Sequence, residues 1–202
     1  MPIQPGEQPI FTAGVIADTH IPDRVNELHP QVLPILRAAG VGHILHAGDV
    51  SVPRALEALR QAAPVSAVRG NRDVFMDGLP MRQTLELGGV RVLLMHGHGG
   101  LGLYLWDKWQ FLLFGYQRER YLRRMDGLRG PEQVVIFGHT HFPEALWRGG
   151  RLIFNPGSAS FGYNRGDSPT LGLLRIYTGG RVHAEIIPLT GCRIEKRRWV
   201  NG

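Results

Sequence analysis

The sequence of 202 residues predicts an α/β protein whose parallel or mixed sheet is covered on both faces. Two observations lead to this prediction. Several short runs of Val, Ile, Leu and Ala end abruptly in polar residues, which is typical of buried strands. Segments with helical character separate the first of these runs, as expected for βαβ units.

The first predicted strand lies in TAGVIADTH, and a helix over 30–39 follows it. The second strand lies in GHILHAGD, and a helix over 53–62 connects it to the third, in APVSAVRGNRD. The fourth and fifth strands lie in VRVLLMHGHGG and EQVVIFGHTH. Short apolar runs bounded by glycine favour strands over helices at these places.

The second half of the chain changes character, because paired apolar segments there surround Gly-Gly turns. EALWRGG-RLIFNPGS predicts a hairpin that turns at Gly149 and Gly150. TLGLLRIYTGG-RVHAEIIPL predicts another that turns at Gly179 and Gly180. Late antiparallel strands are therefore expected.

Residues 101–128 form the one long helical candidate, and they are rich in aromatic and arginine side chains. The aromatic residues are Trp106, Trp109, Phe111, Phe114, Tyr116 and Tyr121, and the arginines are Arg118, Arg120, Arg123, Arg124 and Arg129. The preferred interpretation is an amphipathic helix that packs on the sheet. A lid, or a contact between copies in a homo-oligomer, is the alternative, because the aromatic residues outnumber what one helical stripe needs.

The overall charge suits anionic ligands. With 23 basic and 17 acidic residues the net charge is +6, but no nucleic-acid-recognition module is apparent, so nucleic acid is possible on charge alone. A basic segment near the C-terminus is interpreted as solvated surface (Arg193, Lys196, Arg197 and Arg198).

Cys192 is the only cysteine, which excludes an internal disulfide and a thiolate zinc cluster. Together with the absence of a secretory leader and of any apolar run near the ~20 residues of a transmembrane helix, this predicts a cytoplasmic protein.

All five apolar runs end in potential metal ligands, namely Asp18 with His20, Asp49, Asn71, His96, and His139 with His141. In open α/β sheets, ligands bind beyond the carboxyl ends of the strands, so these side chains are expected to meet in one crevice. In extended backbone, residues i and i+2 project to the same side, which predicts that Asp18 and His20 point into one site together.

The donor set indicates the kind of metal. Imidazole, carboxylate and amide donors together suit Mn²⁺, Fe²⁺, Zn²⁺, Co²⁺ or Ni²⁺ better than Ca²⁺ or Mg²⁺. Seven candidate ligands exceed what one catalytic ion with an open position needs. They suit two ions ~3.5–4 Å apart that share a carboxylate. Each motif is weak by itself, but the order D-x-H, GD, GN, HGH, GHTH is highly specific.

This series of motifs resembles the calcineurin-like metallophosphoesterases, in particular the small bacterial and archaeal phosphodiesterases. The resemblance runs from about Thr12 to Ser158 and includes the NPGS motif that ends there. It implies one metallophosphoesterase domain over 1–202 and a four-layer α/β/β/α sandwich of two mixed sheets. It also implies a dinuclear site at the carboxyl ends of the strands, with two divalent transition-metal ions, most of all Mn²⁺.

The resemblance further implies how the ligands are divided between the ions. The first ion takes the residues that match Asp18, His20 and His141. The second takes those that match Asn71, His96 and His139. The carboxylate that matches Asp49 bridges both. His98 matches a position near the substrate, so it is expected to contact phosphate or to support a ligand.

Arg72 departs from the related protein phosphatases, which carry a histidine directly after the asparagine. Arginine is a poor proton donor but binds phosphate oxygens well. The GNRD motif is similar to that of lipid-precursor pyrophosphate hydrolases of the same superfamily, although those tend to have an acidic residue in place of His98. A local ion pair between Arg72 and Asp73 is the alternative role.

The expected activity is hydrolysis of a small-molecule phosphoester, most of all a phosphodiester, by in-line attack of a metal-bound hydroxide. Asn71, His98 and Arg72 are the expected catalytic residues, because they can neutralise charge on the phosphoryl oxygens. One alternative is hydrolysis of a lipid-linked diphosphate at a membrane surface. Another is a non-catalytic protein-interaction scaffold of the same fold, like the retromer subunit, against which the intact set of ligand residues counts.

Overall fold

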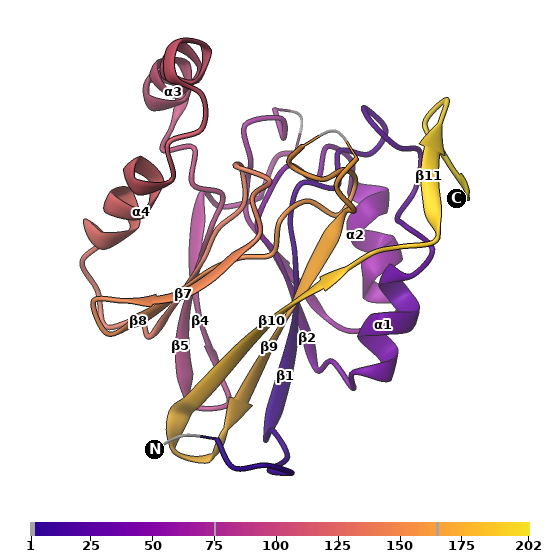
Figure 1. Ribbon diagram of the computed structural model, residues 1–202. Coiled ribbons are helices and arrows are strands. Elements are labelled where there is room, and N and C mark those ends of the chain that lie inside the picture. Colours follow the sequence, from indigo (N-terminus) through magenta and orange to yellow (C-terminus); the bar gives the residue numbers. More distant parts are fainter. Residues whose placement is uncertain (1–2, 75, 165) are drawn as a thin grey trace.

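The computed structural model describes residues 3–74, 76–164 and 166–202. Its core consists of two five-stranded sheets that are both mixed (Figure 1). The first has the order β10-β9-β1-β2-β3, with β1 (Phe11–Ile16), β2 (His43–His46), β3 (Val65–Ala67), β9 (Thr170–Tyr177) and β10 (Arg181–Pro188). The second has the order β4-β5-β6-β8-β7, with β4 (Arg82–Leu87), β5 (Val90–Met95), β6 (Val134–Ile136), β7 (Glu144–Arg148) and β8 (Arg151–Asn155).

Helices cover the outer face of each sheet. Along β1 the side chains alternate, so Val15 faces the second sheet while Ile16 packs on Leu36 of α1 (Val32–Ala38) and on Leu59 of α2 (Pro53–Arg60). Helix α4 (Arg118–Asp126) covers the second sheet with Leu122 and Met125, which are buried on β5, β6 and β8. The expected four-layer α/β/β/α sandwich is therefore confirmed.

The two predicted helices before β2 and β3 and both late hairpins are present. Arg148 pairs with Arg151 across the first Gly-Gly turn, and Tyr177 pairs with Arg181 across the second, where a short 3-10 helix (η1, Thr178–Gly180) forms. Two hairpins were not predicted: β4 pairs with β5, and β11 (Cys192–Glu195) pairs with β12 (Arg198–Asn201). The basic residues of the last hairpin are exposed, as expected of solvated surface.

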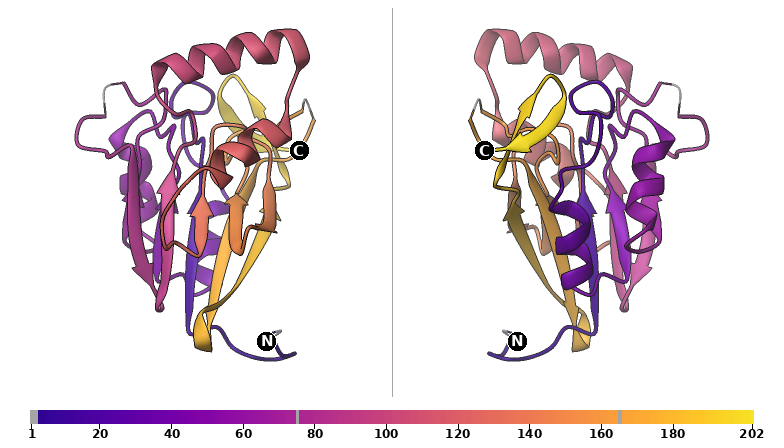
Figure 2. Two further views of the ribbon diagram at one scale, coloured as in Figure 1. Left: turned by 90° about the vertical axis from the view of Figure 1, so that its left-hand side faces the viewer. Right: turned by 90° about the vertical axis from the view of Figure 1, so that its right-hand side faces the viewer.

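The prediction of one long packed helix over 101–128 is wrong in two respects. The segment forms α3 (Leu101–Phe114) and α4, and the chain turns between them at Gly115, where φ is 69°. Only α4 packs on the sheet. Helix α3 lies across one end of the molecule (Figure 2), with Trp106 and Trp109 more than half exposed and Leu112 81% exposed. An apolar helix was recognised correctly, but its apolar surface is left largely uncovered.

No helix in the described part of the chain has the length and apolar character needed to cross a membrane.

Candidate metal centre

The loops that follow β1, β2, β3, β5 and β6 meet at one end of the two sheets, where they gather the candidate ligands. His20 and His141 are 121 positions apart in the sequence, yet their Nε2 atoms are 3.1 Å apart. The expected convergence of distant strand ends on one site is therefore observed.

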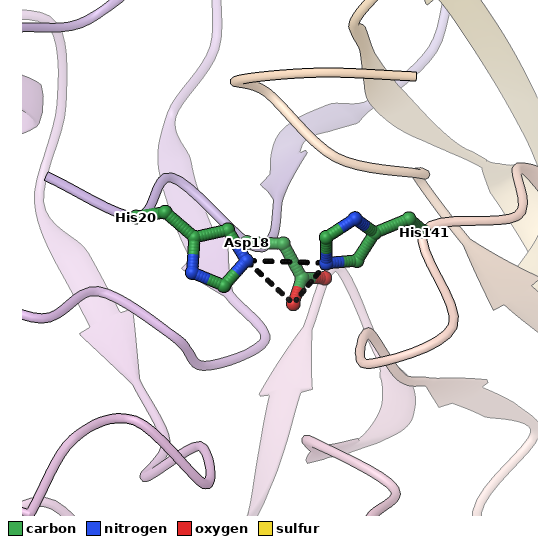
Figure 3. Close-up of side chains that lie close together, drawn as sticks. All are labelled: Asp18, His20 and His141. Atoms are coloured by element: carbon green, nitrogen blue, oxygen red, sulfur yellow. Dashed lines mark hydrogen bonds and ion pairs between the residues drawn. The ribbon is translucent and has the colours of Figure 1, made fainter. Parts of the chain in front are cut away.

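One cluster consists of Asp18, His20 and His141 (Figure 3). The Oδ1 atom of Asp18 lies 3.8 Å from Nε2 of His20 and 3.3 Å from Nε2 of His141. Because three donor atoms approach one another this closely, the cluster could hold a metal ion.

A second cluster surrounds the side-chain oxygen of Asn71. That oxygen lies 3.0 Å from Nε2 of His96 and 2.9 Å from Nδ1 of His139. Asp49 lies between the two clusters, with Oδ1 3.4 Å from Nε2 of His96 and Oδ2 3.9 Å from Nδ1 of His20. A carboxylate in this place can contact ions on both sides.

The backbone at the ligands is not extended, contrary to the reasoning from the sequence. Strands β1 and β6 end before their D-x-H and H-x-H motifs. Asp18, His20, Asp49, His139 and His141 have φ between 47° and 71°, in the left-handed region. Such conformations are unfavourable for residues with a Cβ atom and gather at functional sites. Both residues of each D-x-H or H-x-H pair have a left-handed backbone conformation. The two side chains therefore meet through these turns, and not because alternate residues of a strand share a face.

Two glycines allow the loops to approach one another. A Cβ atom on Gly70 would overlap the Oδ1 and backbone nitrogen of Asp49. Gly48 has a φ of 91°, and a Cβ atom there would lie 2.7 Å from Nδ1 of His96. Both glycines therefore allow the backbone of one loop to approach the ligand residues of another.

Three of the candidate ligands, Asp18, His20 and His139, are in the protonation state that binds metal. Burial lowers the pKa of His20 to about 3 and that of His139 well below its usual value. Burial alone would raise the pKa of Asp18, but the neighbouring His141, His96 and His20 outweigh it and hold the pKa low. Burial raises the pKa of Asp49 to about 6. Burial would lower the pKa of His96, but the negative charges of Asp49 and Asp18 raise it.

The hydrogen bonds of these groups fit a bound cation. The Nδ1–H of His96 donates to the carbonyl of Ala47 at 2.8 Å, so in the neutral ring the lone pair of Nε2 faces the oxygens of Asn71 and Asp49. Among described residues, Oδ1 of Asp18 and Nδ1 of His20 are buried and have no hydrogen-bond partner. In the metal-free protein a proton on His96 supplies positive charge beside these acceptors, in keeping with its raised pKa, and a divalent ion would take the place of that proton.

Asp73 organises the site, although the sequence indicated it only as a partner for Arg72. It is fully buried, and its Oδ2 accepts the backbone N–H groups of Asp49 at 2.9 Å and Gly70 at 2.7 Å. Its Oδ1 accepts the N–H of Ser51 at 2.7 Å. One carboxylate thus joins the loops after β2 and β3. The clue in the sequence was an aspartate within the turn after Gly70, a residue type that commonly bonds to nearby backbone.

Other buried polar side chains support the remaining loops. Ser158 and Ser160 both donate to the carbonyl of Asp18, at 2.9 and 2.8 Å. Asn155 donates to the carbonyl of Gly138 at 3.1 Å, so the NPGS motif supports the two turns that carry the histidine ligands. His46 is buried, which lowers its pKa to about 4, and its Nε2 lies 3.2 Å from the hydroxyl of Thr19.

Arg72 does not pair with Asp73, so the alternative of a local ion pair is wrong. Its guanidinium lies 3.2 Å from Oδ2 of Asp23, and both side chains are close to half exposed. Its backbone N–H donates to Oδ1 of Asp49 at 2.8 Å. The side chain borders the cavity in front of the clusters, so it is available to an anionic ligand.

A cavity of about 330 Å³ opens in front of the clusters and has an aromatic and cationic wall. Its aromatic residues are Tyr104, Phe111, Tyr116, Tyr121, Phe161 and Tyr163, and its cationic residues include Arg24, Arg72 and Lys108. Arg24 lies over the ring of Phe161, 5.2 Å from its centre. Loop aromatics such as Phe161 gave no signal in the sequence, because no pattern there places them beside the ligand motifs.

A second, smaller cavity of about 210 Å³ lies beside the first, and Asn71 and Tyr104 border both. His98 borders this second cavity and is 7% exposed. Burial and the nearby His96 lower the pKa of His98 to about 4, so its ring is neutral.

Comparisons with known proteins agree with this geometry. The family model of the calcineurin-like phosphoesterase superfamily domain matches residues 11–179. A probable metallophosphoesterase of Methanothermobacter thermautotrophicus is 38% identical over 175 residues, which cover 86% of this chain and 90% of that protein.

Two solved structures extend the likeness to three dimensions. Vps29 of Entamoeba histolytica, solved in complex with zinc, is 26% identical with a TM-score of 0.59, over 89% of this chain and all of that one. An archaeal phosphodiesterase shares the fold at 22% identity and a TM-score of 0.54, over 88% of this chain and all of that one. With its ligand clusters at the strand ends, the chain belongs to the calcineurin-like phosphoesterase superfamily, whose activity is divalent-metal-dependent hydrolysis of phosphoester bonds.

Proposed function

We propose that this chain is a dinuclear phosphodiesterase that acts in the cytoplasm, with residues 1–202 as a single catalytic domain. The observation that carries the proposal is the position of Asp49, whose two oxygens face separate clusters of nitrogen and oxygen donors. A single-ion site would not need a carboxylate between two such clusters.

Seven side chains would hold the ions. Asp18, His20 and His141 form the first site, and Asn71, His96 and His139 form the second, with Asp49 shared between them. Divalent ions bound there lower the pKa of water and neutralise charge on phosphoryl oxygens, and Mn²⁺ suits the mixed donors best.

The remaining side chains of the cavity bind and orient the substrate. Arg72 stays charged and borders the cavity beside Asn71, so it would hold phosphoryl oxygens. His98 would contact the substrate from the second cavity. The substrate would therefore meet the charge of Arg72 on one side of the phosphorus and a hydrogen-bonding imidazole on another.

None of the described side chains that line the larger cavity is an obvious proton donor for the leaving group. Beyond the two clusters, its described titratable residues are arginines, a lysine, tyrosines and Asp107. Asp107 lies 2.9 Å from Arg124 and 3.2 Å from Arg120, and burial raises the pKa of Tyr116 to about 12. Esters with good leaving groups should therefore react best, which favours diesters and activated monoesters over phosphoserine.

The test is metal analysis of the purified protein together with a panel of aryl diesters, aryl monoesters, nucleotides and lipid diphosphates. We expect two ions per chain and the highest kcat/KM on diesters. Asp49→Ala should lose bound metal and all hydrolysis. Near-normal turnover of Asp49→Ala with Mn²⁺ would contradict the dinuclear assignment, and exclusive activity on monoesters would contradict the diesterase.

A second candidate function is hydrolysis of a lipid-linked diphosphate, and the exposure of α3 favours it. Tyr104, Lys108 and Phe111 of this helix border the cavity, while Trp106 and Trp109 are exposed. Tryptophans beside a charged site are typical of proteins that bind a membrane surface. Co-sedimentation with anionic phospholipid vesicles tests this candidate. If the protein instead forms a dimer that buries α3 and ignores vesicles, a homo-oligomer is the better account.

If the protein is instead a non-catalytic scaffold, it should fold normally but have no phosphoesterase activity. The Vps29 structures share the fold. The complete pair of clusters here argues for catalysis. A chain that binds no divalent metal and hydrolyses no member of the panel would support the scaffold.

A further inference from the structure

Two cavities flank the side chain of Asn71, although one would be enough for a phosphomonoester. The larger cavity lies towards α3, α4 and Phe161, and the smaller lies towards His98 and Met81. Asn71 belongs to the second ligand cluster, so a phosphoryl group held there would have a cavity on each side. Tyr104, whose ring centre is 5.9 Å from that of His139, borders both cavities.

The smaller cavity has a fixed wall. Arg69 donates to the carbonyls of Asp73 at 3.1 Å and Val74 at 2.9 Å, so its guanidinium is held by backbone. Val74 and Met81 contribute apolar surface at the mouth, and both are about half exposed or more. A group that enters this cavity therefore meets a rigid, partly apolar surface of limited size.

His98 is the polar group of the smaller cavity that lacks a partner. It is more than nine-tenths buried, and in the described part of the chain neither ring nitrogen forms a hydrogen bond. An unpaired buried imidazole costs free energy unless a ligand or water bonds to it. An imidazole nitrogen can donate a hydrogen bond to a hydroxyl group or accept one from it, so a hydroxylated group in this cavity would give His98 a partner.

The larger cavity suits a different substituent. Its aromatic rings provide flat surfaces for stacking, and Arg24 and Lys108 lie over two of them. A planar or bulky apolar group fits there better than in the smaller cavity, which has about 210 Å³ instead of about 330 Å³.

We infer that the substrate is an unsymmetrical phosphodiester, with a bulky planar arm against the aromatic wall and a small hydroxylated arm against His98. This inference rests on the proposed phosphodiesterase function and names the subsite that separates diesters from monoesters. His98 and Met81 determine specificity for the small arm.

Filling the smaller cavity is the first test. Met81→Trp places a large side chain at its mouth, while Ile10→Trp changes a similarly exposed residue outside both cavities and is the matched control. The substrates are 4-nitrophenyl phosphate and its methyl and 3-hydroxypropyl diesters, which share one leaving group. We expect Met81→Trp to lower kcat/KM for both diesters at least tenfold and for the monoester less than twofold, with Ile10→Trp like wild type.

The second test replaces the imidazole by a ring of similar shape. His98→Phe should remove a preference for the 3-hydroxypropyl over the methyl diester that is about threefold to tenfold in wild type, the size of one neutral hydrogen bond. Metal content is measured in parallel, so that loss of an ion is not mistaken for loss of this contact.

The outcomes separate the two proposals. If wild type with Mn²⁺ hydrolyses none of these esters, the phosphodiesterase function itself is wrong. If wild type hydrolyses diesters but Met81→Trp slows monoester and diesters equally, or changes none of them, the small-arm subsite is overturned. An unchanged preference in His98→Phe overturns the role of His98.

Discussion

Individual residues at this site have one of two roles: some are candidate metal ligands, and others hold the loops that carry those ligands. The seven candidate ligands bring their donor atoms together at the strand ends, whereas Asp73, Asn155, Ser158 and Ser160 bond to the backbone of the loops that carry these donors. Five of the seven candidate ligands have left-handed backbone conformations that cost free energy. The buried polar residues offset this cost, so they matter as much for the site as the ligands.

Asp73→Ala should destabilise the protein strongly, because it leaves two buried N–H groups and one partly buried N–H group without their acceptor. At about 1–3 kcal/mol for each buried donor, the loss is several kcal/mol. Thermal unfolding should show a fall in Tm of roughly 6 °C or more for a domain of this size. Asp77→Ala, in the same loop but exposed, is the control and should leave Tm nearly unchanged. Equal Tm values for the two variants would contradict the role of Asp73.

Arg72→Ala should slow every aryl ester by a similar factor, whatever its leaving group. Loss of one charge-assisted contact predicts a fall in kcat/KM on the order of tenfold to a thousandfold, and the 43% exposure of the side chain favours the lower end. The measurement is a plot of log(kcat/KM) against leaving-group pKa. A steeper line for Arg72→Ala than for wild type would mean that the arginine acts on the leaving group.

Among the elements, α3 differs most from the prediction. An apolar helix normally packs on a sheet, but α3 contributes Tyr104, Lys108 and Phe111 to the cavity and exposes much of its remaining apolar surface. Its one acidic residue, Asp107, is buried against Arg120 and Arg124 of α4. Ion pairs therefore attach α3 to the molecule where apolar packing does not.

The exposed tryptophans of α3 can be removed without damage to the fold. The double variant Trp106→Ala/Trp109→Ala should keep its Tm within about 2 °C, since surface changes cost little. KM for small soluble esters should stay near the wild-type value, because neither tryptophan borders the cavity. Phe111→Ala, which changes a cavity residue, should raise KM for bulky aryl esters. A double variant with much lower Tm would show that the tryptophans pack instead.

For the whole molecule, metal binding should depend on pH through Asp49. Its pKa is raised to about 6, so the folded metal-free protein holds this proton below that pH. A bound ion requires the carboxylate, so the proton must leave and apparent affinity should fall as pH drops below about 6. His96, whose pKa is also raised, must lose a proton as well and strengthens this dependence, whereas His20 and His139 add little, since burial keeps them neutral.

Calorimetric titration of the metal-free protein with Mn²⁺ checks this dependence. At pH 6, buffers with different ionisation enthalpies should report proton release on binding, and release should decline towards pH 8. Affinity that stays constant between pH 5 and pH 8 would contradict the raised pKa of Asp49.

The sequence by itself determined the α/β architecture and the identity of the candidate ligands. Apolar runs that end in Asp, Asn or His indicate both a strand and a candidate ligand, since the strand and the polar residue beyond it are adjacent in the chain. The hairpins at Gly149 and Gly179 were predictable for the same reason, because a tight turn is a local feature.

Only the tertiary structure decided the properties that depend on distant neighbours. Asp73 could be assigned its role only once the loops after β2 and β3 were side by side. The exposure of α3 and the two cavities at Asn71 likewise result from how separate segments meet. The physical reason is that burial, hydrogen-bond satisfaction and cavity shape are set by contacts between residues far apart in the chain, which no local pattern records.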